Sequence, residues 1–282
     1  MSSDFDALRR FLLHASGLCL DADKGYLAES RLAPIIQREG LANLGELMRR
    51  IERGTAQDLA LEVVDAMTTN ETFFFRDRTP FDNFRKFILP ELIEARRNIR
   101  RIRIWCCACS SGQEPYSLAM ILDEEVQKLA GWHVDILATD LSRSVLATAR
   151  EGLYSQFEVQ RGLPITQLLR YFRQEGDRWR VNEHLRSRVR FEELNLLSQL
   201  HDIGRFDVIF CRNVLIYFDV PTKKKILDRL ARVLAPDGFF LMGAAETVVG
   251  LTDAMTPHPV HRSISIPRAA SQTRGSLKLA AG

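Results

Sequence analysis

The sequence lacks any long apolar segment. No run approaches the roughly 18 consecutive apolar residues of a membrane-spanning helix. The polar start, Met1-Ser2-Ser3-Asp4, has neither the basic nor the apolar region of a signal peptide. We therefore expect no direct insertion into a membrane, and the predicted location is the cytoplasm.

The chain also lacks an excess of charge of either sign. Lys and Arg number 39 against 36 Asp and Glu, which gives a net charge of +3. Proteins that bind nucleic acid through its phosphates usually carry a concentrated positive charge. Nucleic acid is therefore not the expected partner. With 46% hydrophobic residues over 282 positions, the composition is that of a globular protein with at least one buried core.

Cysteine is scarce, and its five occurrences do not indicate a disulfide framework. The number is odd, and Cys106, Cys107 and Cys109 fall in one short run. Zinc ligands usually come as two separated pairs, and no matching pair of Cys or His stands elsewhere in the sequence. No metal site is therefore predicted. The simpler interpretation is that these small side chains pack where a strand meets a turn.

The first 85 residues show the spacing of amphipathic helices. Four apolar patterns of helical period lie between Asp4 and Met67, and glycines are placed to end the first three of them. A further helix is expected after Thr79-Pro80, where Thr79 would be the N-cap and proline the first helical residue. We predict an N-terminal all-α helical domain over residues 1–85.

From Arg101 onward, short apolar runs alternate with amphipathic segments. This order predicts a mainly parallel, doubly wound sheet covered by helices on both faces, in an α/β domain over residues 86–267. The alternation breaks at residues 154–190, which we interpret as an inserted subdomain. A last strand is expected at the sheet edge within 260–266. The small polar residues 268–282 show no apolar period and predict a disordered tail.

A turn of small residues follows the first predicted strand, in the sequence Ser110-Ser111-Gly112-Gln113-Glu114. Such a turn lets a ligand approach the backbone at a helix start, where nucleotide-like ligands bind in sheets of this kind. The three glycines of a dinucleotide site and the Gly-Lys pair of a phosphate loop are missing, and Glu114 would repel phosphate. A cationic ligand fits better. Glu114 could equally be a first-turn acid that favours the helix dipole.

An aspartate stands at the end of the second predicted strand. In doubly wound sheets an acid at the position of Asp140 can accept hydrogen bonds from ribose hydroxyls. Because Asp140 also precedes the helix expected from Ser142, it could instead be an N-cap. Together with the turn before Glu114, it favours a nucleoside ligand.

The segment Phe210–Phe218 ends a later strand and continues into a loop. Open α/β sheets collect ligand-binding and catalytic groups at such loops. The polar members here are Arg212, Asn213 and Tyr217. Each could also serve only to cap the loop, with Tyr217 half-buried.

Taken together, these motifs resemble the CheR family of chemotaxis receptor methyltransferases, from about residue 4 to residue 266. The family's Thr-Asn-x-Thr-x-Phe-Phe-Arg element is matched by 69–76, its Ser-Thr-Gly-Glu-Glu-Pro-Tyr-Ser turn by 110–117, and its Cys-Arg-Asn-Val-x-Ile-Tyr-Phe element by 211–218. Ser111 and Gln113 depart from the family turn, while Glu114 retains its second carboxylate.

The resemblance implies a Rossmann-like S-adenosylmethionine-dependent methyltransferase with a small inserted β subdomain. By resemblance, it converts glutamate side chains on chemotaxis receptors into methyl esters and releases S-adenosylhomocysteine. The active-site pair would be Arg76 and Tyr217. The cofactor contacts would be Asn70, Thr72, Arg76, Glu114, Asp140, Asn195, Leu196, Arg212 and Asn213.

The expected partner is the cytoplasmic helical region of a receptor, bound by a monomeric enzyme. The turn at 173–179 is shorter than the loop of family members that bind a receptor's C-terminal peptide, so no peptide tether is expected. The basic surface of the second helix is also thinner, with Lys24, Arg31 and Arg38 retained. Two alternatives stay open, a regulatory module that binds the cofactor without turnover and a methyltransferase for nucleic acids or small molecules.

Overall fold

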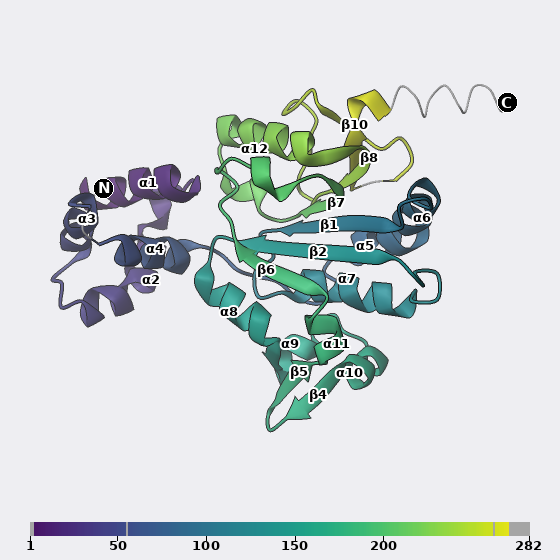
Figure 1. The fold of residues 1–282 in the computed structure, drawn as a ribbon. Helices are drawn as coiled ribbons and strands as arrows, with labels where there is room; N and C mark the ends of the chain where they lie inside the picture. Colours follow the sequence, from purple (N-terminus) through teal and green to yellow (C-terminus); the bar gives the residue numbers. More distant parts are fainter. Residues whose placement is uncertain (1–2, 55, 262, 271–282) are drawn as a thin grey trace.

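The computed structural model describes residues 3–54, 56–261 and 263–270 (Figure 1). Four helices form the N-terminal part, α1 (Ser3–Ser16), α2 (Gly25–Arg38), α3 (Leu44–Glu52) and α4 (Gln57–Met67). Their apolar faces share one core, with Leu8, Leu12, Leu32, Leu47 and Val63 fully buried. The predicted all-α part is therefore present, and it builds its own core.

A second helical stretch follows, made of α5 (Thr79–Asn83), a π-helical turn (Phe84–Ile88) and α6 (Leu89–Ala95). Thr79 is the first residue of α5 and not its N-cap, so that prediction was wrong. The N-cap position belongs to Arg78, whose left-handed backbone (φ 44°) turns the chain into the helix. Phe81 and Phe84 pack into the core of the sheet. Because of this packing we propose a domain boundary near residue 68 in place of the division at 85.

The sheet has seven strands in the order β6-β2-β1-β7-β8-β10-β9. The first five run parallel, β10 pairs antiparallel with β8, and β9 pairs antiparallel with β10. The strands are β1 (Arg101–Cys107), β2 (His133–Asp140), β6 (Val189–Glu193), β7 (Phe206–Cys211), β8 (Leu234–Leu241), β9 (Met255–Pro257) and β10 (Ile264–Pro267). The prediction that the last strand forms the edge was wrong. β9 occupies the edge, and with three residues it is too short to show a strand pattern.

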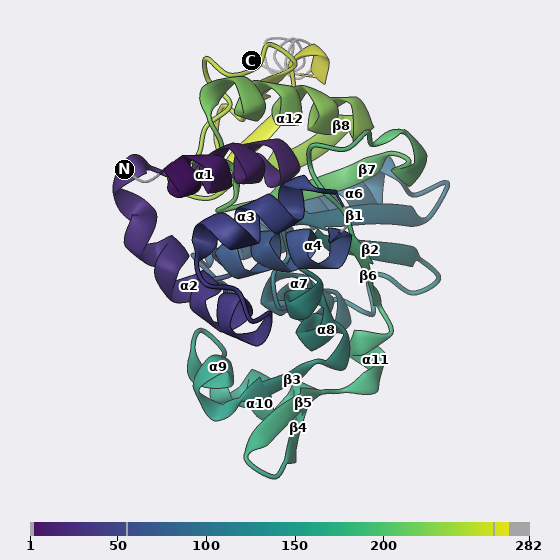
Figure 2. The same cartoon turned by 90° about the vertical axis from the view of Figure 1, so that its left-hand side faces the viewer.

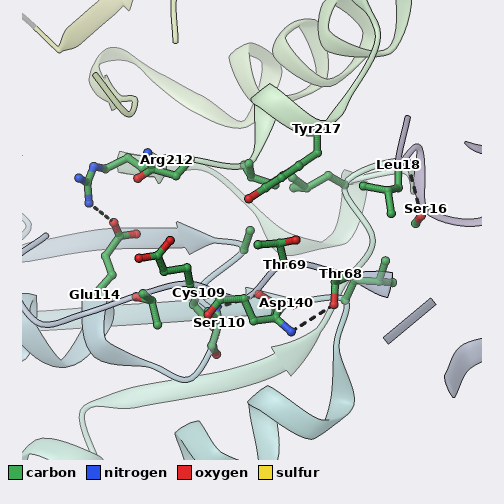
Figure 3. Close-up of a pocket in the computed structure, with 18 of the residues that line it drawn as sticks. Ser16, Leu18, Thr68, Thr69, Cys109, Ser110, Glu114, Asp140, Arg212 and Tyr217 are labelled. Atoms are coloured by element: carbon green, nitrogen blue, oxygen red, sulfur yellow. Dashed lines mark hydrogen bonds and ion pairs between the residues drawn. The ribbon is translucent and has the colours of Figure 1, made fainter. Parts of the chain in front are cut away.

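The N-terminal helices lie beside the carboxyl ends of the parallel strands, as Figures 1 and 2 show from two sides. The cavity drawn in Figure 3 lies at this junction, since its lining residues come from the end of α1, from residues 68–72 and from the loops after β1, β2, β6 and β7. In open α/β sheets this edge is the usual ligand site.

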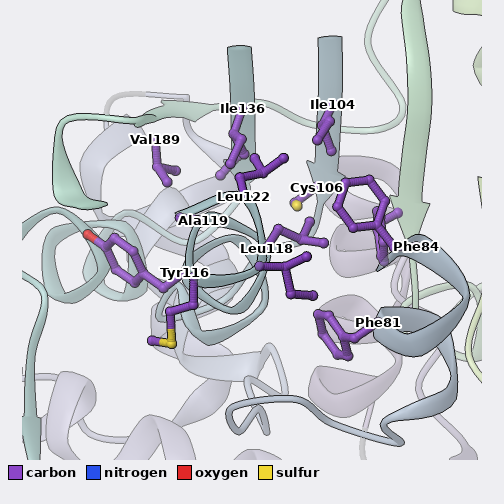
Figure 4. Close-up of a cluster of buried hydrophobic side chains, with 14 of the residues drawn as sticks. Phe81, Phe84, Ile104, Cys106, Tyr116, Leu118, Ala119, Leu122, Ile136 and Val189 are labelled. Carbon is purple, nitrogen blue, oxygen red and sulfur yellow. The ribbon is translucent and has the colours of Figure 1, made fainter. Parts of the chain in front are cut away.

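The two faces of the sheet have separate cores. Along β1, Ile102, Ile104 and Cys106 belong to one cluster, whereas Trp105 and Cys107 belong to the other. This alternation is the two-residue period of a strand buried on both faces. The first face is covered by the α5–α6 stretch, α7 (Gln113–Glu124) and α8 (Arg143–Glu151), and part of its cluster is drawn in Figure 4. The second is covered by α12 (Val220–Val233).

The inserted subdomain is present as predicted. It contains β3 (Leu153–Ser155), α9 (Gln156–Gln160), α10 (Ile165–Tyr171), β4 (Phe172–Glu175), β5 (Arg178–Val181) and α11 (Glu183–Arg186). The three strands form an antiparallel sheet in the order β3-β5-β4. Glu175 pairs with Arg178, so a turn of only two residues joins β4 to β5.

The predicted disordered tail lies outside the described residues from 271 onward. Residues 268–270 are described and are helical, so the disorder prediction was wrong for these three. The Nε of Arg268 donates to the carbonyl of Asp253 at 2.7 Å. Within the part of the chain that the structure describes, no helix is both long enough and apolar enough to cross a lipid bilayer.

Candidate active site

The cavity at the junction of the two parts brings together every residue that the sequence predicted for the site (Figure 3). The fold brings these residues together from five separate segments of the chain. Their roles in binding and catalysis are predictions. The predicted residues that line it are Asn70, Thr72, Arg76, Glu114, Asp140, Asn195, Leu196, Arg212, Asn213 and Tyr217. Ser110 belongs to the small-residue turn that the sequence predicted to meet a ligand, and it also lines the cavity. The lining residues that the sequence did not predict are Ser16, Leu18, Thr68, Thr69, Glu71, Ala108, Cys109, Leu141, Leu194, Val214 and Phe218.

The small-residue turn after β1 has an unusual backbone. Ala108, Ser110 and Gly112 all have positive φ angles, of 51°, 50° and 95°. At Gly112 a side chain would meet Ala149, because an added Cβ would lie 3.0 Å from that residue's Cβ. Strained backbone of this kind persists where the surrounding structure holds it, often at functional sites. Here the turn brings its backbone to the cavity wall.

Asp140 holds this turn in place. Its carboxylate accepts hydrogen bonds from the backbone N–H of Ser110 at 2.8 Å and of Ser142 at 2.9 Å. The side chain of Ser142 accepts from the N–H of Val145 and is the N-cap of α8, so Asp140 is not the N-cap. Burial raises the pKa of Asp140, and the two backbone hydrogen bonds oppose that shift. The acid therefore both fixes the turn and faces the cavity.

Glu114, which also lines the cavity, forms a buried ion pair with Arg212. Arg212, whose side chain is 2% exposed, donates to Glu114 at 2.7 Å and to Asp77 at 2.8 Å. Burial raises the pKa of Glu114, and the Arg212 guanidinium acts against this rise. If Glu114 served only to favour the dipole of its helix, it would not need the Arg212 guanidinium as a partner. The two carboxylates also neutralise Arg212, so this cation is already committed within the protein.

The guanidinium of Arg76 has different partners from that of Arg212. Its guanidinium donates to the backbone carbonyl of Glu71 at 2.6 Å and lies over the ring of Phe73, 5.7 Å from the centroid. Among the described residues, no carboxylate lies within ion-pair distance of Arg76. It is therefore the cation of the cavity that has charge left for a ligand. The next residues Asp77 and Arg78, like Phe75 before them, have positive φ angles and turn the chain sharply here.

Tyr217 comes from the short 3-10 turn Leu215–Tyr217 after β7, and its side chain points into the cavity (Figure 3). Its backbone carbonyl accepts from the N–H of Cys19 at 2.9 Å, which ties this loop to the N-terminal helices. No hydrogen-bond partner for the Tyr217 hydroxyl is found among the described residues. The hydroxyl is thus available to a ligand.

Asn195 has a role that the sequence did not predict. Its side-chain amide donates to the carbonyl of Ala15 at 2.8 Å, and its side-chain oxygen accepts from the N–H of Leu197. Asn195 therefore connects the loop after β6 to the end of α1. Ser16 and Leu18, which close the cavity beside this bond, were missed because nothing in their sequence distinguishes them from an ordinary helix end.

The cysteine run packs into the protein. Cys106, Cys107 and Cys109 are each at most 2% exposed, and burial raises the pKa of all three thiols. Within the described ranges, no group of three or more His, Cys, Asp and Glu side chains is arranged to hold a metal ion.

The cavity therefore combines carboxylates, apolar walls and the Arg76 guanidinium, for which the described part of the chain supplies no carboxylate partner. Asp140 and Glu114 suit hydroxyl donors and a positive charge, and Leu18, Leu141 and Leu196 can pack against a flat apolar group. This combination fits a nucleoside that carries a cationic group. Arg76 and Tyr217 can in turn hold an anionic group beside it.

Comparison with known proteins gives one family for both parts of the chain. The model described as "CheR methyltransferase, all-alpha domain" matches residues 3–68, and "CheR methyltransferase, SAM binding domain" matches residues 70–264. "Chemotaxis protein methyltransferase 1" of Pseudomonas aeruginosa is 46% identical over 258 residues, covering 89% of this chain and 93% of the relative. "Chemotaxis protein methyltransferase Cher2" of Pseudomonas putida is 44% identical, with 89% and 92% covered. A "Chemotaxis protein methyltransferase" of Borreliella burgdorferi is 37% identical, with 88% and 89% covered.

Proposed function

This chain belongs to the CheR methyltransferase family, and from that premise we propose that it converts glutamate side chains of chemotaxis receptors into methyl esters. It is an S-adenosylmethionine-dependent methyltransferase with a Rossmann-like cofactor-binding domain and an all-α N-terminal domain. S-adenosylhomocysteine is the product left by the cofactor. The observation that supports the substrate assignment is the placement of Arg76, whose guanidinium has no carboxylate partner within the described ranges, in the same cavity as the two cofactor-side carboxylates.

The residues of the cavity fit this cofactor. Asp140 would accept from the ribose hydroxyls, Glu114 would lie at the positively charged end, and Leu196 would pack against the base. Asn70, Thr72, Asn195, Arg212 and Asn213 would complete the contacts. When bound, S-adenosylmethionine supplies a methyl group carried on a positively charged sulfur.

Methyl transfer to a glutamate carboxylate requires little proton transfer by the protein. A glutamate carboxylate has a pKa of about 4.3 and is already an anion at neutral pH, so no general base is needed. Among the described residues that line the cavity, none is a histidine. The work of the chain is to align the carboxylate and to exclude water.

Arg76 and Tyr217 are the residues we propose for that alignment. The Arg76 guanidinium can pair with the incoming carboxylate, since its protein partners are a carbonyl and a ring. The Tyr217 hydroxyl can donate a second hydrogen bond to it. Holding the carboxylate too tightly would stabilise the ground state, so one ion pair and one hydroxyl suit the task.

Receptor recognition is proposed to occur without a peptide tether. Peptide-binding members of the family add the peptide as a strand at the edge of the inserted sheet. In this chain a two-residue turn joins β4 to β5, which shortens the segment available beside that edge. We further propose that the enzyme acts as a cytoplasmic monomer on the helical region of the receptor.

Transfer of a radiolabelled methyl group tests the function. The complete chain should label a receptor cytoplasmic fragment, the label should be released by mild base as expected of an ester, and Arg76→Ala should abolish it. The same reaction with RNA and with small metabolites tests the other substrate classes. Labelling of RNA instead of receptor, or cofactor binding without any transfer, would contradict the proposal.

A further inference from the structure

Glu246 lies outside the lining of the cavity but controls the loop that enters it. Its carboxylate accepts four backbone N–H groups. Oε2 accepts from Asn213 at 2.7 Å and from Gly243 at 2.8 Å, and Oε1 accepts from Val214 at 3.1 Å and from Leu215 at 2.7 Å. Hydrogen bonds to a charged acceptor are about twice as strong as neutral ones. One side chain thus fixes three consecutive backbone groups of the loop after β7.

These three backbone groups need a partner from outside the loop. Asn213 has a φ of 58°, a conformation that costs a non-glycine residue free energy. Leu215 begins the 3-10 turn that ends at Tyr217, and the first N–H groups of a helical turn have no acceptor within it. Glu246 satisfies both requirements and so determines where Tyr217 lies.

Gly243 makes this approach possible. A Cβ added there would lie 2.8 Å from Oε2 of Glu246 and 2.7 Å from Nδ2 of Asn213. Real Cβ atoms do not approach other atoms so closely, so any side chain would displace one of them. Glu246 and Gly243 therefore act as one unit, although neither reaches the cavity.

We propose that Glu246 is a positioning residue for methyl transfer, which holds residues 213–217 so that the Tyr217 hydroxyl meets the substrate carboxylate. The proposal rests on the proposed function, because it gives Tyr217 its role. Glu246 contributes no contact to cofactor or substrate and acts through Tyr217 and Asn213.

Two substitutions of different kinds test this role. Glu246→Gln replaces one acceptor oxygen by an amide that faces N–H donors, and Gly243→Ala displaces the carboxylate itself. Each should slow single-turnover methyl transfer by about tenfold to a hundredfold, the range expected when a reacting group is misplaced by about 1 Å. The matched controls are Glu94→Gln, at a carboxylate that is 75% exposed, and Gly25→Ala, where an added Cβ meets nothing within 4 Å. Both should keep the wild-type rate.

A double-mutant cycle separates positioning from general damage. In the Glu246→Gln background, Tyr217→Phe should cause little further loss, because the hydroxyl is already misplaced. Rates that fall by the product of the two single effects would overturn the proposal, and so would a full rate for Glu246→Gln.

Hydrogen exchange gives a readout that does not depend on the receptor. The amides of residues 213–215 should lose protection in Glu246→Gln and keep it in Glu94→Gln. Unchanged protection would overturn the inference whatever the activity shows. A wild-type enzyme that labels no receptor would count against the proposed function instead, so the two failures are distinguishable.

Discussion

Two carboxylates face the cavity, and their removal from water disfavours the ionised form of each. Each carboxylate is held by a different kind of partner. Asp140 is fixed by backbone N–H groups and Glu114 by the guanidinium of Arg212. Both have raised pKa values because burial disfavours their ionised forms. We expect a ligand that supplies hydroxyl donors and positive charge to offset this desolvation cost.

The raised pKa of Asp140 predicts how stability depends on pH. Between its unfolded pKa, about 3.9, and its higher folded pKa, the folded chain holds a proton that the unfolded chain has released. The stability from this group is therefore fully present below the unfolded pKa and is lost as pH rises through the folded pKa. In urea unfolding at several pH values without cofactor, wild type should lose free energy of unfolding relative to Asp140→Asn across this window.

A free energy of unfolding of wild type that stays constant or rises with pH relative to that of Asp140→Asn would contradict this account. Asp253→Asn, which removes a fully exposed carboxylate, is the matched control for the change of charge.

Tyr217→Phe should separate catalysis from cofactor binding. The hydroxyl has no hydrogen-bond partner among the described residues, so its removal breaks no hydrogen bond that the structure describes. Losing one hydrogen bond to a charged group should slow single-turnover transfer by about tenfold to a hundredfold. Calorimetry should show nearly unchanged affinity for S-adenosylmethionine. Arg76→Ala should lower both, and Tyr26→Phe, at a side chain that is 60% exposed on α2, should change neither. A full rate for Tyr217→Phe would remove Tyr217 from catalysis.

Most of the site residues predicted from sequence stand in contiguous motifs, whereas Asp140, Asn195 and Leu196 lie outside them. Residues 69–76, 110–117 and 211–218 each carry several polar groups at fixed spacing, which is what a resemblance detects. Glu246 could not be found in this way, because its partners are backbone N–H groups that every sequence possesses. The bond from Asn195 to Ala15 joins residues 180 positions apart, and only the folded chain brings them together.

At the scale of elements, the inserted subdomain packs against the segment after α4 that contains Phe74. Phe74 is fully buried, and its ring packs edge-on against Tyr154 and Phe172. Gly162 approaches the same segment so closely that an added Cβ would lie 2.0 Å from the carbonyl oxygen of Phe74. Arg161 adds an ion pair to Glu71 at 2.5 Å. The subdomain thus supports the backbone that carries Arg76.

Gly162→Ala should therefore disturb the active site from outside it. Alanine is strained at the φ of 89° and also collides with Phe74, so we expect a loss of about 1–3 kcal/mol in the free energy of unfolding and a weaker affinity for cofactor. Gly176→Ala is the matched control, since Gly176 has a φ of 62° and an added Cβ there meets nothing within 4 Å. Thermal melts and calorimetry on both variants measure the difference. Equal effects would show that the approach to Phe74 is unimportant.

Most helices and strands were predictable from the spacing of apolar residues in the sequence. Those that were not have physical causes. The helix α4 (Gln57–Met67) ends at the residue where the helical pattern of the sequence ends, because its apolar residues keep a helical period up to Met67. The order of β9 and β10 was not predictable, since β9 is held by pairing with β10 and has no pattern of its own. Thr79 has the residue type of an N-cap, yet the left-handed Arg78 moves the helix start by one position.

At the scale of the whole molecule, receptor recognition should not depend on a tail peptide. An isolated peptide from the receptor C-terminus should show no saturable binding at micromolar concentrations, because the two-residue turn between β4 and β5 leaves a short edge. Receptor fragments with and without their C-terminal segment should also be methylated at equal rates. Saturable micromolar binding of the peptide, measured by calorimetry, would contradict this prediction.

The connection between the two parts of the chain is also a wall of the cavity. Each residue from 68 to 72 lines it, and the carbonyl of Asn70 accepts from the hydroxyl of Ser110 at 2.8 Å. Segments that join domains are ordinarily where insertions and deletions accumulate during evolution. Here a single added residue would shift Arg76 relative to the turn after β1. We therefore expect the two domains to be inherited as one piece, and a relative that exchanges its helical domain for another to keep this junction at the same length.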